Sequence, residues 1–202
     1  MEALDKVAEP IFSPLLHRYT LEEFWTLPEP DNRSHYELIG GYLFMVPPPA
    51  SSHDDLVARL NRSLLLFLEA KHVQGDVHHP RAAIYRQAMG GTYLEPDMMY
   101  VSKELRGRMG SKRSSADIVF ECVSASSGAY DRTTKADTYL ALGVRELWLI
   151  DSDSATVEVR NAVKCEDRPT WEISRFSRGE QAESRVLPGW AVTVDELFEG
   201  LT

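Results

Sequence analysis

The chain has 202 residues, of which 43% are hydrophobic, which is ample for one core. No stretch approaches the roughly 18 consecutive apolar residues that a membrane span needs, and residues 1–5 lack the basic start and apolar run of a secretory signal. The formal net charge of -9 argues against a nonspecific coating of nucleic acid, because phosphate neutralisation supplies most of that affinity. We therefore expect a single domain over residues 1–202, located in the cytoplasm and without a membrane partner.

The chain contains two cysteines, Cys122 and Cys165, which are too few for a disulfide framework. Cys122 alternates with apolar residues in a presumed core strand, where a free cysteine behaves as a small hydrophobe. Since disulfides are also rare in the cytoplasm, both cysteines are expected to be reduced and unpaired.

The first third of the chain contains a short helix, a hairpin and a longer helix by its sequence pattern. Thr20 and Glu23 have capping-box spacing, which predicts a short helix. Residues 36–46 form two apolar runs around a Gly-Gly pair, a pattern typical of a β-hairpin. From Ser52 leucines recur every fourth residue and predict an amphipathic helix of about four turns: Leu56, Leu60, Leu64 and Leu68.

The middle of the chain is expected to form strands that lead to Asp97. Residues 77–85 suggest one strand, and a second Gly-Gly pair turns the chain into the strand that carries Asp97. A basic segment with glycines and serines follows and looks mobile: Lys103, Arg106, Arg108, Lys112 and Arg113. It is either a solvated loop or a patch that contacts phosphates, and the sequence leaves both interpretations open.

Residues 117–151 read as a strand, a helix and a second strand. The first strand, residues 117–123, is apolar except for Glu121. Asp131 is the expected N-cap of a helix that runs to about Leu142, and residues 145–151 return as a strand. Two strands connected in this way form a βαβ unit with parallel pairing.

The last part of the chain adds an antiparallel pair at residues 155–159 and 171–176 and a short helix at residues 194–201. Together with the βαβ unit, this order of elements predicts an α/β fold. Its core is expected to be a mixed sheet flanked by helices, with additional antiparallel strands.

Asp97 and Glu121 are the strongest functional signals. A carboxylate inside an apolar strand is costly unless a positive group satisfies it. The structural alternative for Glu121 is a salt bridge to a core arginine, and for Asp97 it is ordinary Pro-Asp turn chemistry. Lys135 shares a helix stripe with Tyr139 and Leu142, so it either points inward or is a surface lysine whose ammonium stays in water.

The ordered set of these segments resembles the Uma-type restriction endonuclease family of the PD-(D/E)XK nuclease superfamily. The resemblance covers nearly the whole chain. It rests on residues 36–41, Pro47 with His53, residues 95–97, residues 117–124, Asp131 with Lys135 and Tyr139, residues 143–151, and residues 187–190. It implies a restriction-endonuclease-like core that hydrolyses the phosphodiester bonds of nucleic acid, with DNA as the expected substrate.

The resemblance also implies a metal site. Asp97 and Glu121 would bind Mg²⁺ or Mn²⁺, and the backbone carbonyl of Cys122 could add a ligand, because these ions prefer oxygen ligands. The usual lysine of the superfamily would stand at Val123, and its role passes to Lys135 on the helix.

Further site residues follow from the same resemblance. Glu37 is similar to an additional acid of the superfamily that binds a second metal ion or anchors a water. His53 is a candidate contact to a phosphate or leaving group, and the basic segment offers candidate phosphate contacts at Lys103, Arg106 and Arg108. Cleavage of both strands of a duplex would favour a homodimer.

Two other functions remain open. A catalytically silent nuclease-fold protein, acting as a nucleic-acid-binding or regulatory module, accounts better for the acidic net charge. A serine hydrolase that uses Ser124, Ser126 or Ser127 is poorly supported, because the chain has no Gly-x-Ser-x-Gly elbow.

Overall fold

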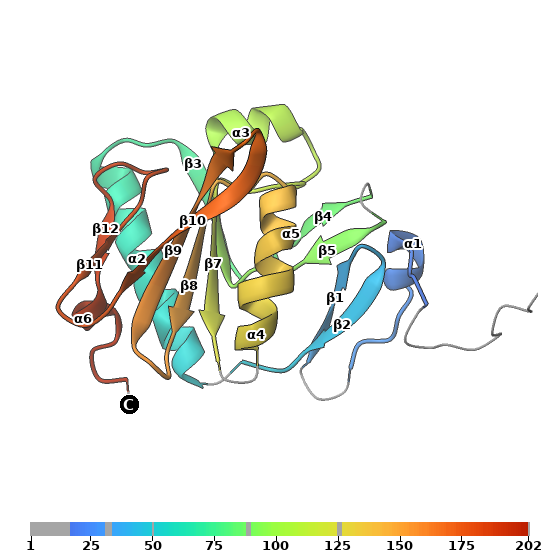
Figure 1. Cartoon of the computed structure of the whole chain (residues 1–202), viewed down its shortest axis with the longest axis horizontal. Helices are drawn as coiled ribbons and strands as arrows, with labels where there is room; N and C mark the ends of the chain where they lie inside the picture. Colours follow the sequence, from blue (N-terminus) through green and yellow to red (C-terminus); the bar gives the residue numbers. More distant parts are fainter. Residues whose placement is uncertain (1–16, 31–33, 50, 88–89, 125–126, 202) are drawn as a thin grey trace, which may run out of the picture.

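The computed structural model describes residues 17–30, 34–49, 51–87, 90–124 and 127–201 (Figure 1). Its largest element is a six-stranded sheet in the order β10-β9-β8-β7-β6-β3. These strands are β3 (Gly75–His78), β6 (Met98–Ser102), β7 (Ile118–Val123), β8 (Glu146–Asp151), β9 (Thr156–Cys165) and β10 (Arg168–Phe176). Strands β7 and β8 are parallel and the other neighbours are antiparallel, so the predicted mixed sheet is confirmed.

A smaller four-stranded sheet, in the order β2-β1-β5-β4, lies beside the main sheet (Figure 1). Its strands are β1 (His35–Ile39), β2 (Tyr42–Val46), β4 (Ile84–Arg86) and β5 (Thr92–Leu94). The predicted hairpin is confirmed by the pairing of β1 with β2, and its turn uses Gly40 and Gly41 at φ 59° and 85°. Residues 77–85 were predicted to form one strand, but they divide between β3 of the main sheet and β4 of the smaller sheet. Asp97 was expected within a strand, but it precedes β6.

Helices cover both faces of the main sheet (Figure 1). Helix α2 (Ser51–Ala70) packs on one face through the four leucines of the predicted stripe, all of which are buried. A continuous helical segment packs on the other face and consists of α4 (Gly128–Tyr130), a π-helical turn η1 (Asp131–Lys135) and α5 (Ala136–Ala141). The remaining short elements are α1 (Leu21–Phe24), α3 (Lys103–Met109), α6 (Val194–Leu197), β11 (Gln181–Glu183) and β12 (Ala191–Thr193).

Strand β7 shows how the sequence pattern produces these layers. Ile118 and Phe120 belong to the apolar cluster on the α2 side, and Val119 and Val123 belong to the cluster on the α5 side. Alternate residues of a strand point to opposite faces, so Glu121 shares the face of α5. Because both faces of β7 are covered, its carboxylate is buried, with 3% of the residue exposed.

Two predicted local structures differ from the observed ones. The helix after β7 begins at Gly128, so Asp131 lies inside it and is not its N-cap. The basic segment is not a loop throughout, because the hydroxyl of Ser102 accepts a hydrogen bond from the backbone N–H of Leu105 and caps helix α3. The capping hydroxyl of Ser102 accounts for the start of α3, whereas the N-cap of α4, Ser127, makes no side-chain capping hydrogen bond.

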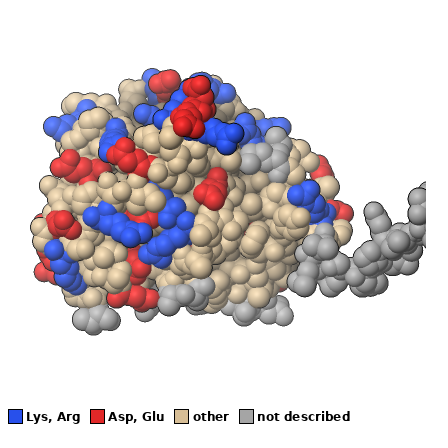
Figure 2. All heavy atoms as spheres, in the orientation of Figure 1, with Lys and Arg blue, Asp and Glu red and all other residues tan. Residues whose placement is uncertain are grey.

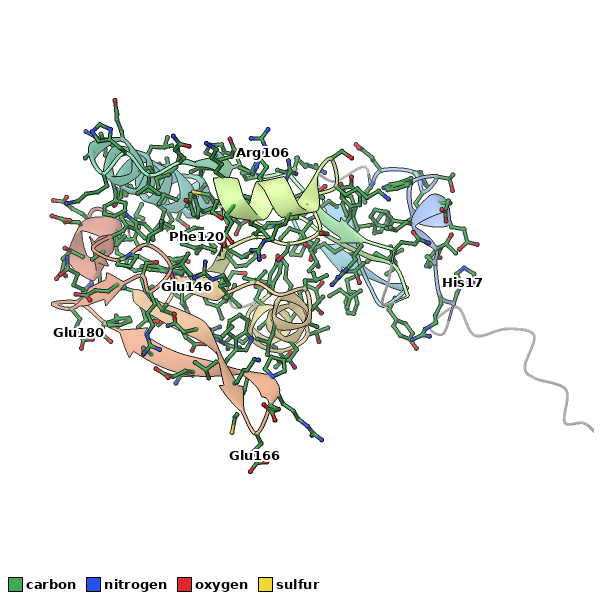
Figure 3. All side chains as sticks on the ribbon, turned by 90° about the horizontal axis from the view of Figure 1, so that it is seen from above. His17, Arg106, Phe120, Glu146, Glu166 and Glu180 are labelled. Carbon is green, nitrogen blue, oxygen red and sulfur yellow. The ribbon has the colours of Figure 1, made fainter. Side chains whose placement is uncertain are left out.

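The C-terminal third follows the predicted order with different lengths. Strands β9 and β10 form the expected antiparallel pair, which extends to a turn near Glu166 that projects from the body of the molecule (Figure 3). Helix α6 is shorter than expected, at four residues. Cys122 and Cys165 are both free, as predicted. Within the described ranges, no helix has the length and apolar character required to cross a membrane.

Gly75 provides a test of the packing between β3 and β6. A Cβ atom at this position would lie 2.5 Å from Cε2 of Tyr100, so the buried ring would have to shift. We expect Gly75→Ala to lower the free energy of unfolding by about 1–3 kcal/mol in urea denaturation, the usual cost of overpacking. The matched control is Gly107→Ala, because no atom lies within 4 Å of a Cβ there and stability should be unchanged or slightly raised. Equal stabilities of Gly75→Ala and the unsubstituted protein would contradict the packing.

Candidate active site

The carboxylate of Glu121 is enclosed by polar partners from the helical segment above it. Its Oε1 accepts a hydrogen bond from the Tyr139 hydroxyl at 2.5 Å and lies 2.9 Å from Nζ of Lys135. Burial raises the pKa of Glu121 well above the ordinary range of a glutamate, although Lys135 opposes this. The alternative interpretation of Glu121 was a salt bridge to a core arginine. The observed cationic partner of Glu121 is a lysine, Lys135.

Lys135 points inward and joins three carboxylates. Its Nζ lies 3.2 Å from Oε1 of Glu37 and 3.9 Å from Oδ1 of Asp131, in addition to its contact with Glu121. Burial alone would lower the pKa of Lys135, but the surrounding carboxylates raise it well above its usual value. Only 4% of its side chain is exposed, so it is a buried ammonium and not a surface lysine.

The π-helical turn η1 contains both Asp131 and Lys135 and lies within a longer helical segment. Such wide turns are rare and frequently occur at functional sites. Asp131 and Lys135 are both buried, at opposite ends of this turn. The irregular backbone therefore coincides with the two charged side chains that the helical segment contributes to the site.

Glu37 comes from β1 of the smaller sheet and is completely buried. Its Oε1 accepts a hydrogen bond from the backbone N–H of Glu95 at 2.9 Å, and its Oε2 accepts one from the Tyr130 hydroxyl at 3.0 Å. The Tyr130 ring stacks on Phe44, with ring centroids 4.9 Å apart. With both oxygens bonded, Glu37 is fixed in place beside Lys135.

Asp97 lies just before β6 and connects β7 to helix α2. Its Oδ2 accepts a hydrogen bond from the backbone N–H of Cys122 at 2.7 Å, and its Oδ1 lies 2.8 Å from Nε2 of His53 in the first turn of α2. Met98 pairs with Phe120 across the two strands, so Asp97 stands opposite Glu121 when that register is continued by one residue. The negative charge of Asp97 contributes to the raised pKa of Glu121.

His53, Asp97 and Cys122 bring together three side chains that can bind a metal ion. Their ligand atoms all lie within 4.8 Å of one another, and Glu121 is not part of this cluster. Burial would lower the pKa of His53, but the hydrogen bond and charge of Asp97 raise it above the ordinary value. Burial, reinforced by Asp97 and Glu121, raises the pKa of the Cys122 thiol well above its usual range.

The basic residues of α3 do not lie beside these carboxylates. Asp97 precedes β6 and α3 follows it, so the two are separated by the length of a five-residue strand, about 16 Å. Lys103 Nζ donates to Oε1 of Gln74 at 2.7 Å, and Arg106 pairs with Asp76. Figure 2 shows basic side chains over α3 interspersed with acidic ones, and Arg106 lies on its outer side (Figure 3).

Sequence reasoning missed two tyrosines and an acid of this site. Tyr139 was placed in an apolar stripe and among the residues that carry the family resemblance, but it was given no role in the site, yet its hydroxyl donates to Glu121. Tyr130 carried no signal by itself. Glu95 directly precedes Pro96 and Asp97, and this closeness to a predicted site residue was the signal in the sequence that could have identified it. Its backbone N–H bonds Glu37, and its Oε1 accepts a hydrogen bond from the Tyr93 hydroxyl at 3.0 Å.

A mixed sheet with helices on both faces, with the half-buried Asp97 and the buried Glu121 on neighbouring segments of it, is the arrangement of the restriction-endonuclease-like nuclease fold. A crystal structure from Anabaena variabilis, described as a putative nuclease belonging to DUF820, has this fold with a TM-score of 0.71 and 19% sequence identity. The likeness covers 91% of this chain and 99% of that chain. The Uma2 family model, described as "Putative restriction endonuclease", matches residues 21–195, and the chain belongs to this family. A comparison with curated proteins found no significant match.

Proposed function

We propose that this protein is a metal-dependent endonuclease that hydrolyses phosphodiester bonds, with DNA as its expected substrate. The observation that carries the proposal is the charge of the buried cluster. Four carboxylates surround two cationic side chains, which leaves an excess of two negative charges when all are ionised; the groups are Glu37, Asp97, Glu121 and Asp131, with Lys135 and His53. One divalent cation would balance this excess, and uncompensated buried charge is costly.

Asp97, Glu121 and the backbone carbonyl of Cys122 are the groups that would hold Mg²⁺ or Mn²⁺. All three offer oxygen, the ligand that these ions prefer. The backbone N–H of Cys122 bonds Asp97, and the N–H and C=O of one strand residue point toward the same neighbouring strand. The Cys122 carbonyl is therefore directed to the Asp97 side. When bound, the ion would lower the pKa of a water ligand and neutralise charge on the phosphate.

Lys135 acts on the reacting water and on the phosphate. Its ammonium lies 2.9 Å from Oε1 of Glu121, so it would orient a water beside that carboxylate and stabilise the negative charge of the transition state. Glu37 and Asp131 keep the ammonium of Lys135 protonated and hold it beside Glu121, so they are positioning residues. We accordingly assign Glu37 to the orientation of Lys135, because its Oε1 lies 3.2 Å from the ammonium.

His53 would contact a phosphate or the leaving group. Its Nε2 pairs with Asp97, which favours the protonated ring. A protonated imidazole is a hydrogen-bond donor that suits a phosphate oxygen and can give a proton to a departing alkoxide. Its place at the start of α2, beside Asp97, supports this assignment.

The alternative is a nuclease-fold protein without turnover that binds nucleic acid or regulates a partner. The acidic net charge of -9 favours it, because strong nonspecific binding of a polyanion is unfavourable. A calorimetric titration with Mg²⁺ and Mn²⁺ separates the two functions. A nuclease binds the ion with an affinity that depends on Glu121, whereas a silent module has no need of it.

The test of the proposed function is incubation of the protein with single- and double-stranded DNA and RNA in Mg²⁺ or Mn²⁺. We expect metal-dependent cleavage of DNA that EDTA abolishes and that is lost in Glu121→Gln. Cleavage of both strands would take two sites, so we expect a homodimer on duplex DNA, which light scattering can measure. The two unpaired thiols agree with our assignment to the cytoplasm. Intact substrates under all conditions would favour the silent module.

The pKa of Glu121 predicts how metal affinity changes with pH. Because its folded-state pKa is raised by burial, the carboxyl holds a proton above the ordinary glutamate pKa of about 4.3, and a metal ion must displace that proton. Affinity for Mg²⁺ should therefore rise up to about tenfold per pH unit until the raised pKa is passed, and then level off. Calorimetry between about pH 5 and about pH 8 measures this dependence. An affinity that stays constant or falls with rising pH would contradict the assignment of Glu121 as a ligand.

A further inference from the structure

His53, Asp97 and Cys122 form a cluster whose donor atoms differ in kind from those of the magnesium site. His53 comes from the first turn of α2, Asp97 from the loop before β6, and Cys122 from β7. The Cys122 side chain points to the α2 side of the sheet, opposite to Glu121, and contacts the apolar cluster there while remaining partly exposed. Three elements distant in sequence thus converge on one point with a nitrogen, an oxygen and a sulfur donor.

This donor set fits a transition metal ion better than Mg²⁺. Magnesium takes oxygen ligands, whereas imidazole and thiolate are characteristic ligands of Zn²⁺ and its neighbours in the periodic table. Three protein ligands with a fourth position open to water are typical of zinc sites outside closed structural centres. We infer that His53, Asp97 and Cys122 form a binding site for Zn²⁺, adjacent to the proposed magnesium site and sharing Asp97 with it.

The distances in the cluster are close to those that a tetrahedral ion requires. Metal–ligand bonds of 2.0–2.3 Å place the ligand atoms about 3.3–3.6 Å apart. The observed ligand atoms lie within 4.8 Å of one another, and the His53 to Asp97 contact is 2.8 Å. Adjustments of about 1 Å or less in side chains would therefore admit the ion, which would take the place of the proton between His53 and Asp97 and of the thiol proton of Cys122.

Neighbouring groups would hold two of the ligands in place. The backbone N–H of Cys122 bonds Oδ2 of Asp97, which leaves Oδ1 for the metal. Nδ1 of His53 is buried without a hydrogen-bond partner and lies 3.6 Å from Oδ1 of Asp54. Metal-bound histidines commonly donate their second ring N–H to a carboxylate, and a small rotation would let Asp54 accept it. In the metal-bound state, Nδ1 of His53 would therefore gain the hydrogen-bond partner that it lacks here.

Zn²⁺ at this site would inhibit the proposed nuclease, and this part of the inference rests on the proposed function. Asp97 cannot serve both ions with the same oxygens, and a thiolate and an imidazole bind Zn²⁺ far more tightly than they bind Mg²⁺. Occupation by Zn²⁺ would therefore remove one carboxylate from the magnesium site and displace His53 from its phosphate contact.

Binding is tested with Co²⁺, which substitutes for Zn²⁺ and gives a near-ultraviolet charge-transfer band when a thiolate binds it. We expect a band that saturates at one Co²⁺ per chain and disappears when Zn²⁺ is added. Cys122→Ser should abolish the band, and His53→Gln should weaken Co²⁺ binding by at least about tenfold. Cys165→Ser is the matched control, because Cys165 is exposed and distant in sequence from the cluster, and its band should equal that of the unsubstituted protein. A missing band, or one that persists in Cys122→Ser, would overturn the site.

Inhibition is tested by adding Zn²⁺ to the magnesium-dependent cleavage reaction, with each variant normalised to its own rate without Zn²⁺. We expect inhibition of the unsubstituted protein and of Cys165→Ser at Zn²⁺ concentrations at least tenfold lower than for Cys122→Ser. Equal sensitivity of all three would refute the regulatory role. Because the cobalt spectrum requires no cleavage, a protein that binds Co²⁺ but cleaves nothing would refute the proposed function and leave the metal site standing.

Discussion

Lys135→Met is expected to abolish cleavage and to lower the free energy of unfolding by about 3–5 kcal/mol, the usual cost of removing one partner from a buried ion pair. The substitution leaves the carboxylates of Glu121 and Glu37 buried without their cation. Cleavage should fail because no other described side chain places a cationic group within 4 Å of Glu121. Urea denaturation and the nucleic-acid cleavage assay measure the two effects.

The destabilisation by Lys135→Met should depend on pH in a defined direction. Burial raises the pKa of Glu121 and Lys135 opposes that rise, so without the ammonium the folded-state pKa of Glu121 rises further. The folded state of the variant then retains a proton that the unfolded chain has released. The loss of stability should be largest near neutral pH and shrink toward the ordinary carboxyl range near pH 4. Lys71→Met is the matched control, because Lys71 is exposed and its removal should change stability by less than about 0.5 kcal/mol. Unchanged cleavage in Lys135→Met would contradict the role of this lysine.

Glu121→Gln is expected to reduce metal-dependent cleavage by at least a hundred- to a thousandfold, roughly the effect of removing one preorganised electrostatic group. The amide keeps the shape of the side chain but cannot bind Mg²⁺ as a carboxylate does. Folding should be retained, because Lys135 keeps its contact with Glu37 and one buried charge is removed. Calorimetry should record a matching loss of Mg²⁺ affinity. Glu69→Gln, on the exposed side of α2, should behave as the unsubstituted protein, and a normal rate in Glu121→Gln would contradict the site.

The core of the fold was predictable because its signals are local. The apolar run of residues 118–123, interrupted only by Glu121, is typical of a strand that is buried on both faces. The strand, helix and strand order around it predicts a parallel pair. The leucine stripe of α2 is equally local, with a period that only a helix satisfies. Each of these patterns is complete within one continuous segment of the chain, residues 118–151 for the strand, helix and strand and residues 51–70 for α2.

The site was predictable only in part, because its geometry depends on contacts between distant segments. Glu121 was recognisable as a carboxylate in an apolar strand, but its partner Lys135 was one of several cations that could have paired with it. Nothing in the sequence links Glu37 to Tyr130, which lie 93 residues apart and form a hydrogen bond. The helical segment begins at Gly128 without a side-chain cap at Ser127, so no capping signal marked its start and Asp131 was mistaken for the N-cap.

The position of the basic segment was also outside the reach of sequence reasoning. Its glycines suggested a loop, and its place soon after Asp97 suggested proximity to the site. A strand, however, carries the chain away from its starting point, and β6 separates α3 from Asp97. Although the basic segment is close to Asp97 in sequence, it therefore lies at the other end of β6.

The most direct test of the metal site is diffraction from crystals soaked in Mn²⁺, measured at a wavelength that records the anomalous signal of manganese. We predict one strong peak in contact with the carboxylates of Asp97 and Glu121 and the carbonyl oxygen of Cys122, at metal–oxygen distances near 2.1–2.2 Å, and its loss in Glu121→Gln. A map without a peak between Asp97 and Glu121, at a Mn²⁺ concentration that supports cleavage, would contradict the proposed nuclease site.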